Sequence, residues 1–283
     1  MLPLSHVQYV RVPELSMIQV PRILASIRLL KNPSLDYNWA MVTQDRLERF
    51  RCRYAQMRSG WLPATTVYQQ KVATVLTPGC RVLDLGCGRG GIVERLGGQG
   101  LWVGVDPDWE SLYQHRARTI TRSHGAAERL SFPAQTFDLV VASWVLEHLP
   151  APEITFREVA RVLRPGGSFF FLTPNVAHPL PWLSRAVARL LRFQRWAVAR
   201  AYGRAPVDTF PVFYRANSVE QILRLAAQSG LRLVELALIE DPAYFAWNAP
   251  TLCAAVSANR LLSPMAKVHL VGQLTKPCVA GQG

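Results

Sequence analysis

One ten-residue segment constrains the fold of this chain more than any other part of the sequence. Residues 82–91 read VLDLGCGRGG, so an apolar strand pattern ends in an acidic residue and then in a glycine run that opens a helical pattern. Glycine has no Cβ, which lets the backbone turn sharply and approach a bound molecule closely. The segment therefore predicts a strand–turn–helix unit with a ligand over the turn.

Beyond this segment, short apolar runs alternate with helical segments. Such runs are typical of buried strands, and strands that alternate with helices favour a mostly parallel sheet covered on both faces. A further strand at 119–122 is required by this topology, although its residues signal it poorly. The predicted strands are 81–85, 101–105, 137–142 and 168–173, and the predicted helices are 92–96, 109–119 and 152–163.

The flanking segments complete a division of the chain into four parts. Residues 1–34 contain several prolines and no sustained period, so we expect a loosely ordered arm, and residues 35–77 have helical spacing. The α/β domain is expected to span 78–258 with a helical insert at 175–216, and 259–283 is expected to form a C-terminal tail. Late in the domain we predict a helix at 218–228, a strand at 231–239 and a last strand at 251–257.

Two carboxylates near the glycine turn narrow the choice of ligand. Gly86, Gly88 and Gly91 fit the dinucleotide fingerprint G-x-G-x-x-G, which alone is a weak signal. Asp84 precedes the first glycine by two residues, where it would repel a pyrophosphate and face the amino group of a methionine moiety. Asp106 ends the second strand, where a carboxylate can bind the ribose hydroxyls of a dinucleotide or of a nucleoside that carries methionine. These residues leave both kinds of ligand open, and Asp84 favours the one that carries methionine.

Five short blocks extend the signal over about residues 70–175. They are Asp84-x-Gly86-x-Gly88-x-Gly90, Asp106-Pro107, FDLVVAS at 137–143, LEHL at 146–149 and LRPGG at 163–167. Together they resemble the class I S-adenosylmethionine-dependent methyltransferases of the ubiquinone/menaquinone type (methyltransferase type 11-like). The resemblance implies a Rossmann-like α/β fold: a seven-stranded, mostly parallel sheet with one antiparallel strand and helices on both faces. It also implies S-adenosyl-L-methionine as the cofactor.

The resemblance assigns cofactor-binding roles to residues of these blocks. The glycines of the first block would line the methionine and ribose, Asp106 would bind the ribose hydroxyls, and Ser143 would lie near the sulfonium. The family places an acidic residue against the adenine amino group just before Ala127, where this chain has Ala126, so the adenine would rely on backbone groups and stacking. The candidate cofactor-binding residues are Asp84, Gly86, Cys87, Gly88, Gly90, Asp106, Pro107, Ala127 and Ser143.

His148 is the candidate catalytic residue. Methyl transfer needs alignment and exclusion of water, and it needs a base only when the acceptor must lose a proton. His148 follows the strand-end Ser143, and imidazole is the side chain that changes charge near neutral pH. The alternative is that His148 caps or packs the turn before Pro150. In the ubiquinone-pathway O-methyltransferases that the blocks resemble, the Glu-His pair belongs to a metal-associated acidic motif with a further Glu three residues before it. This chain has Trp144 at that position, so no metal is predicted.

The expected acceptor is a hydrophobic or lipid-like small molecule, apolar or aromatic, that is methylated at O or C. The insert at 175–216 is rich in aromatic residues and has apolar residues at helical spacing with arginines on other faces. That pattern suits a lid over an apolar acceptor or, through 180–204, peripheral contact with an anionic membrane. Other interpretations are an RNA methyltransferase, a non-catalytic cofactor-binding partner subunit and a nicotinamide-dependent oxidoreductase. The oligomeric state stays open.

Charge and cysteine usage set wider limits. There are 32 Lys and Arg against 19 Asp and Glu, a formal net charge of +13. This excess fits nucleic acid, an anionic membrane surface or an acidic substrate, and equally arginines on solvated faces. Five scattered cysteines without a C-x-x-C pair argue against a disulfide framework and a zinc site. The sequence has no apolar run near the ~20 residues of a membrane span and no apolar N-terminal signal, so we expect a cytoplasmic protein.

Overall fold

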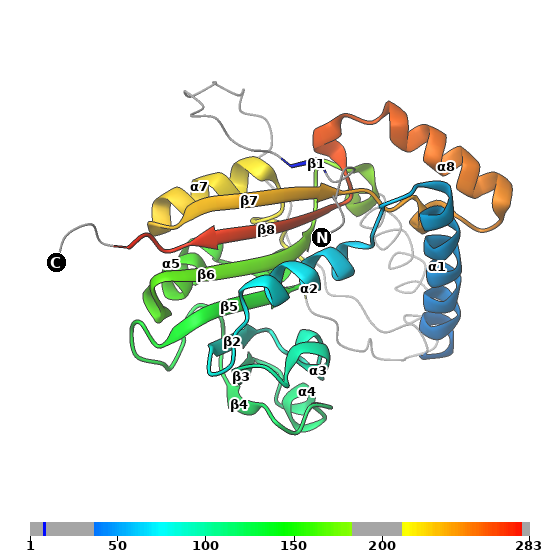
Figure 1. The fold of residues 1–283 in the computed structure, drawn as a ribbon. Helices are drawn as coiled ribbons and strands as arrows, with labels where there is room; N and C mark the ends of the chain where they lie inside the picture. Colours follow the sequence, from blue (N-terminus) through cyan, green and yellow to red (C-terminus); the bar gives the residue numbers. More distant parts are fainter. Residues whose placement is uncertain (1–7, 10–36, 183–210, 279–283) are drawn as a thin grey trace, which may run out of the picture.

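The computed structural model describes residues 8–9, 37–182 and 211–278. Its centre is one eight-stranded sheet with the strand order β1-β7-β8-β6-β5-β2-β3-β4 (Figure 1). The strands are β1 (Gln8–Tyr9), β2 (Arg81–Leu85), β3 (Leu101–Asp106), β4 (Thr121–His124), β5 (Phe137–Ser143), β6 (Leu163–Pro174), β7 (Arg232–Ile239) and β8 (His269–Thr275).

The seven-stranded, mostly parallel sheet predicted from the sequence is confirmed. Strands β4, β3, β2, β5 and β6 are parallel neighbours, and β8 runs antiparallel between β6 and β7. The poorly signalled strand is present as β4. The short β1 adds an eighth strand, antiparallel to β7. Two residues of the segment expected to be a loose arm therefore belong to the sheet.

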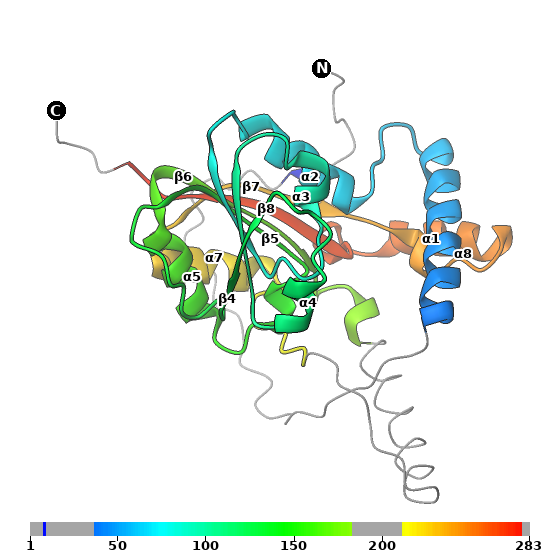
Figure 2. The same cartoon turned by 90° about the horizontal axis from the view of Figure 1, so that it is seen from below.

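Helices cover both faces of the sheet, as Figure 2 shows from below. Helix α2 and the short α3 lie on one face, and α5 and α7 lie on the other. The helices are α1 (Tyr37–Met57), α2 (Ala64–Val75), α3 (Ile92–Leu96), α4 (Trp109–Tyr113), α5 (Pro152–Val162), α7 (Val219–Ser229) and α8 (Ala249–Leu261), with 3-10 turns η1 (Leu146–His148), η2 (Pro242–Phe245) and η3 (Pro264–Ala266).

Two apolar clusters, one on each face, hold these layers together. Phe156 of α5 and Ile222 of α7 are fully buried in one cluster, and Val67 and Val72 of α2 are buried in the other. Burial of side chains of this size is worth about 1.5–3 kcal/mol each, so the sheet is stabilised from both sides. The clusters also define the two faces: the α2 face, which carries α2, and the opposite face, which carries α5 and α7.

Capping residues explain where helix α7 begins and ends. The Ser218 side chain accepts a hydrogen bond from the backbone N–H of Gln221 at the start of α7. Gly230 follows the helix with a φ of 74°, a left-handed conformation that glycine adopts without a Cβ penalty. The helix predicted at 218–228 with Gly230 as its cap is therefore confirmed.

The prediction of a last strand at 251–257 is wrong. These residues lie inside α8, because Asn248 and Thr251 form a reciprocal capping box and Pro250 occupies the first turn, where its missing N–H costs nothing. The last strand is β8 instead, so the sheet continues past residue 258 into the segment expected to be a tail.

Helix α4 is also shorter than the predicted 109–119, since it ends at Tyr113. The N–H of Arg116 donates to the carbonyl of Arg89 in the glycine loop, 2.9 Å away, which draws this part of the chain out of a helical path.

Much of the predicted helical insert lies outside the described residues. Residues 179–182 are helical, and 183–210, with most of the predicted membrane-contacting stretch 180–204, fall in the part that the structure does not describe. Among the described helices, none combines the length and the apolar character that crossing a bilayer requires.

Cys87 packs against the second strand and so fixes the glycine loop on the sheet. Its side chain is buried, and a Cβ built on Gly104 of β3 would lie 2.6 Å from Cys87 Sγ and 2.8 Å from Ile120 Cδ1. Gly104 does not have a positive φ, so its lack of a side chain is required by close packing alone. The small thiol and the glycine together let the loop lie close to β3.

We expect Gly104→Ala to lower the free energy of unfolding by about 1–3 kcal/mol, because the new methyl group overpacks this contact. Urea denaturation measures the change. Gly98→Ala is the matched control, since a Cβ there meets no atom within 4 Å. An equal loss in both variants would contradict the packing role of Gly104.

Candidate functional site

The candidate site lies along the edge where the parallel strands end. Strands β2, β3, β5, β6 and β7 end at this edge and β8 begins there, because β8 is antiparallel to its neighbours. Helices α1 and α8 lie beyond the same edge (Figures 1 and 2). Polar side chains from segments far apart in sequence are therefore brought to one place.

The glycine loop leaves β2 with a backbone that requires glycine. Gly86 and Gly88 have φ values of 69° and 52°, and Gly90 has a φ of 137°. The N–H of Gly86 donates to the carbonyl of Val105 at 2.7 Å, which ties the turn to β3. A Cβ placed on Gly88 would meet no atom within 4 Å, so the space over this residue is open. The loop thus presents bare backbone to that space.

Asp106 lies directly against the glycine loop. Its carboxylate accepts a hydrogen bond from the N–H of Gly88 at 2.8 Å and another from the N–H of Asp108 at 2.8 Å. These two bonds hold the carboxylate at the end of β3, beside the open space over the loop. The ribose contact expected for Asp106 stays a prediction.

Asp84 is buried next to this carboxylate. It is 5% exposed, and burial followed by the charge of Asp106 raises its pKa to about 7. A carboxylate with so high a pKa is poised to pair with a cation, since an opposite charge nearby would restore the ionised form.

Tyr68 of α2 is a site residue that sequence analysis did not single out. Its hydroxyl oxygen is buried and has no hydrogen-bond partner. Burial, and then the charge of Asp84, raises the pKa of Tyr68 well above its ordinary value, which places the phenol close to that carboxylate. The sequence showed only helical spacing around Tyr68, and the contact arises from packing of α2 on the sheet.

The remaining candidate cofactor residues take different positions. The carbonyl of Pro107 lies 3.0 Å from His124 Nε2. Ala127 is half-buried and packs against the apolar cluster opposite α2, so backbone atoms are what it can offer a ligand. Ser143 ends β5 and pairs with Leu172 of β6. Cys87 faces Gly104, which leaves its backbone, rather than its thiol, for a ligand.

Two further features lie at the end of β3 and after β4. Trp109 is 67% exposed, and its ring meets the His124 ring edge-on at 5.6 Å. Glu128 has a side-chain oxygen that is shielded from solvent and without a hydrogen-bond partner. Glu128 follows Ala126, where the expected acidic residue is missing, by two positions. The sequence points to neither feature, except that Trp109 lies close to the Asp106-Pro107 motif.

Trp144 leaves β5 in a conformation that a large side chain rarely adopts. Its φ is 60°, and its N–H donates to the carbonyl of Leu172 at 2.9 Å. Its ring contacts the ring of His269 edge-on, with 5.2 Å between centroids. Such backbone strain costs on the order of 1–3 kcal/mol and tends to occur at functional sites. The strained turn directs the indole along the sheet edge toward β8.

His148 and Glu147 fasten the chain that follows the insert. His148 Nδ1 lies 2.9 Å from the carbonyl of Pro211, and the Glu147 carbonyl accepts from the N–H of Phe213 at 2.7 Å. The buried Glu147 carboxylate accepts from the Thr173 hydroxyl at 3.1 Å, and burial raises its pKa. The predicted base His148 therefore lies at the site edge, and Glu147 is turned into the protein.

Helix α1 is anchored where β7 ends at this edge. Arg51 Nη2 lies 2.7 Å from Asp241 Oδ2, and the Tyr54 hydroxyl donates to Glu240 at 2.6 Å. Both carboxylates are buried and directly follow β7. These bonds hold a helix from the start of the chain against the end of a strand nearly two hundred residues later.

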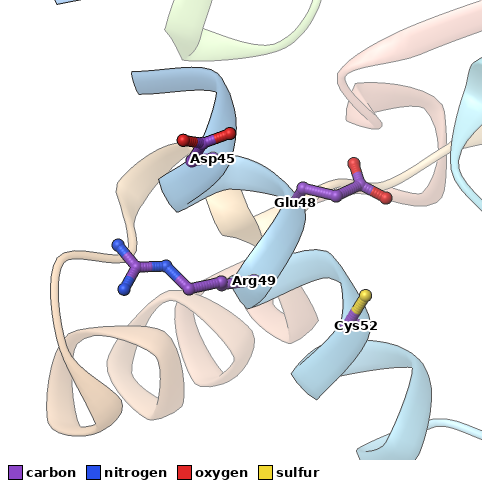
Figure 3. Close-up of a pocket in the computed structure, with 4 residues that line it drawn as sticks. All are labelled: Asp45, Glu48, Arg49 and Cys52. Carbon is purple, nitrogen blue, oxygen red and sulfur yellow. The ribbon is translucent and has the colours of Figure 1, made fainter. Parts of the chain in front are cut away.

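A cavity of about 760 Å³ lies beside α1, bordered by Asp45, Glu48, Arg49 and Cys52 (Figure 3). In Figure 3 Asp45 and Arg49 extend to one side of the helix, and Glu48 and Cys52 to the other. Glu48 also lies 4.0 Å from Arg51, so the cavity adjoins the anchor of α1.

Comparison with known proteins fits this geometry. Residues 83–171, which run from β2 into β6, match the protein family described as a methyltransferase domain. Together with the strand order and the loop between β2 and α3, this match decides the assignment. This part of the chain is a class I methyltransferase domain. The resemblance predicted from the motif blocks is thereby confirmed.

Curated relatives of the domain include two O-methyltransferases. The mitochondrial ubiquinone biosynthesis O-methyltransferase of Rattus norvegicus is 38% identical over 108 residues, covering 34% of this chain and 31% of that protein. The fatty-acid O-methyltransferase of Mycolicibacterium smegmatis is 30% identical over 129 residues, covering 43% of this chain and 47% of that protein. The chain spans less than half the length of the curated relatives it matches.

A solved structure extends the likeness beyond the domain. The S-adenosylmethionine-dependent methyltransferase from Mesorhizobium loti matches with a TM-score of 0.51 at 19% identity, covering 75% of this chain and 98% of that one. At this identity the comparison supports the fold alone.

The methyltransferase domain fits an S-adenosylmethionine molecule by its own features. Two carboxylates flank an open glycine turn, and an unpartnered phenol lies near one of them. Among the described residues, His, Cys, Asp and Glu side chains do not gather in a group of three or more able to hold a metal ion.

The raised pKa of Asp84 predicts how stability depends on pH. The folded chain holds this proton more tightly than the unfolded chain, whose aspartates titrate near pH 4, so the free energy of unfolding should fall as pH rises from about 4 to 7. Asp84→Asn cannot lose a proton and should lack that part of the decline, which is on the order of 4 kcal/mol. Urea denaturation between pH 4 and pH 8 in the absence of ligand is the measurement. Parallel curves for the two proteins would contradict the raised pKa.

Proposed function

We propose that this chain binds S-adenosyl-L-methionine and transfers its methyl group to an oxygen or carbon of a hydrophobic or lipid-like small molecule. The observation that carries the proposal is the pair of buried carboxylates, Asp84 and Asp106, on either side of an open glycine turn. A pyrophosphate would be repelled there, whereas a ligand with an ammonium group and a ribose satisfies both carboxylates.

Each carboxylate would have one task in binding. Asp84 would pair with the ammonium group of the methionine moiety, which returns the buried carboxyl to its ionised form. Asp106 would accept hydrogen bonds from the ribose hydroxyls, as its bond to the Gly88 N–H already places it beside the loop. When bound, S-adenosylmethionine supplies a methyl group on a positively charged sulfur that leaves readily.

The acceptor would bind on the far side of Ser143, along the edge toward β8. Trp144, Tyr244 and Phe245 bring aromatic surface to this region, and His178 and His269 lie among them. An aromatic, water-poor wall suits an apolar molecule and excludes water from the transfer. The names of the two O-methyltransferase relatives, one of ubiquinone biosynthesis and one of fatty acids, support acceptors of this kind.

His148 is the proposed base for acceptors that must lose a proton. A carbonyl oxygen only accepts hydrogen bonds, so the contact with Pro211 places a proton on Nδ1. In the neutral ring Nε2 is then the basic nitrogen. The role requires the acceptor hydroxyl to come within hydrogen-bond reach of Nε2.

Calorimetry with S-adenosylhomocysteine tests the proposal. Asp106→Ala should weaken binding by about 1.5–3 kcal/mol, the range for hydrogen bonds to a charged group. The wild-type affinity should rise between pH 6 and pH 8 as Asp84 ionises, and Asp84→Asn should remove that rise. Asp138→Asn is the control, since Asp138 lies at the opposite end of β5.

Two results would contradict the proposed function. One is NAD binding in place of S-adenosylhomocysteine. The other is an affinity for S-adenosylhomocysteine that neither Asp84→Asn nor Asp106→Ala changes.

A further inference from the structure

A second polar group lies at the same edge of the sheet, apart from the residues proposed to hold the cofactor. It is a chain of contacts, the α1–β8 chain, made of Asp241, Arg51, Tyr244 and His269. A binding role for this chain of contacts rests on the proposed function, because its ligand would be the molecule that receives the methyl group.

His269 faces the same side of the sheet as Asp84. It is the first residue of β8 and pairs with Pro174 of β6 and Ile239 of β7. Ile239 belongs to the cluster on the α2 face, and residues paired across a sheet point to the same side. Asp84 pairs with Val141, which belongs to that cluster as well. The two side chains thus lie on one face, at one edge, with β5 and β6 between their strands.

The α1–β8 chain fixes which ring nitrogen of His269 carries a proton. Arg51 Nη2 donates to the Tyr244 oxygen at 3.5 Å, and the Tyr244 oxygen lies 3.2 Å from His269 Nε2. A guanidinium cannot accept a hydrogen bond, so the Tyr244 proton is directed to Nε2. Burial, and then Asp241, raises the pKa of Tyr244, which keeps that proton in place. A neutral imidazole that accepts at Nε2 has its own proton on Nδ1.

The Nδ1–H of His269 is a buried donor without an acceptor. The residue is 3% exposed, and Nδ1 has no hydrogen-bond partner. An unpaired buried polar group costs about 1–3 kcal/mol, and native proteins rarely keep one without a reason. A ligand atom that accepts this hydrogen bond would supply the reason.

His269 suits binding rather than proton removal. Burial, followed by the charge of Arg51 and the nearby His178, lowers its pKa to about 3. Burial also lowers the pKa of His178 to about 4, and the His178 Nδ1 accepts from the N–H of Leu180 at 3.0 Å. Both rings are therefore neutral near pH 7, and a neutral N–H donates to an oxygen without taking its proton.

The position of His269 relative to Ser143 matches the size of a small acceptor. Strands β5 and β8 are separated by β6 alone, so two strand spacings, about 10 Å, lie between them. Trp144, which follows Ser143, fills part of that span and touches the His269 ring edge-on. An apolar acceptor lying on the indole would reach from the methyl donor to the Nδ1–H.

We propose that His269, held by Tyr244, is the specificity residue of the acceptor site, where its Nδ1–H donates a hydrogen bond to an oxygen of the methyl acceptor. The acceptor class is an apolar molecule with a carboxylate, phenolic or keto oxygen. Tyr244 is a positioning residue, which acts by keeping the ring proton on Nδ1.

The variants His269→Asn and His269→Gln distinguish a role of Nδ1 from a role of Nε2. Asparagine has its amide nitrogen where histidine has Nδ1, whereas glutamine reaches the position of Nε2. The probes are 4-hydroxybenzoate and 4-hydroxyacetophenone, each with an alkyl substituent, because their carboxylate or keto oxygen lies across the ring from the phenolic oxygen. Each is tested on protein saturated with S-adenosylhomocysteine for binding and with S-adenosylmethionine for turnover. His269→Gln should raise Kd and KM for a probe about tenfold with kcat little changed, the loss of one hydrogen bond. His269→Asn should recover most of the affinity, and the preferred probe identifies the acceptor oxygen.

Controls separate this role from folding and from the cofactor. The affinity for S-adenosylhomocysteine should be the same in wild type and both variants. His115→Gln, which alters another buried histidine near α4 with an unpartnered Nε2, should leave probe binding unchanged. Nitrogen-15 NMR of the imidazoles should show the His269 proton on Nδ1, and Tyr244→Phe should reduce that preference.

Several outcomes overturn the inference while leaving cofactor binding intact. They are probe affinities unchanged in His269→Gln, equal losses in His269→Gln and His269→Asn, a His269 proton found on Nε2, and binding of neither probe by wild type that binds S-adenosylhomocysteine. Failure to bind S-adenosylhomocysteine at all would instead refute the proposed function.

Discussion

The proximity of two carboxylates at a water-poor edge of the sheet is the constraint on which the site depends. Strands β2 and β3 are parallel neighbours, so Asp84 and Asp106 are brought together wherever these strands end. Burial and the charge of Asp106 hold the pKa of Asp84 at about 7. The ionised form of Asp84 is therefore disfavoured in the folded protein. A positively charged ligand would restore it, because an opposite charge favours the ionised carboxylate. The fold thus favours binding of a cationic group beside the glycine turn.

Unpartnered polar groups continue this pattern along the same face of the sheet. The hydroxyl of Tyr68 and the Nδ1 of His269 are buried without hydrogen-bond partners, one near Asp84 and one beyond Trp144. Each lies on the face that α2 covers. Such groups lower stability unless something binds them, so both are positions where a bound polar atom would stabilise the fold.

A network around Glu240 anchors α1 and the segment after it to the end of β7. Tyr54 and Lys267 donate to the buried carboxylate of Glu240, and Trp61 donates to its backbone carbonyl at 2.9 Å. Burial alone would raise the pKa of Glu240, but Lys267, Tyr54 and Arg58 lower it. The network therefore favours the ionised, paired form of Glu240. It also holds α1 in the position from which Arg51 reaches Asp241 and Tyr244.

The sequence by itself determined the parts that rest on local patterns. The glycine turn and the succession of strands along residues 81–174 follow from spacing and from backbone preferences that act within a few residues. Ambiguous apolar stretches were beyond such reasoning: 251–257 reads as a strand until the Asn248 capping box is seen.

Only the tertiary structure decided which other polar side chains gather at the edge of the sheet. Tyr68, Tyr244 and His269 come from α2, η2 and β8, and no local pattern relates them. Their meeting depends on β8 inserting antiparallel between β6 and β7 and on α1 and α2 packing against the sheet. Burial and missing hydrogen-bond partners are properties of that packing, so they become visible once the chain has folded.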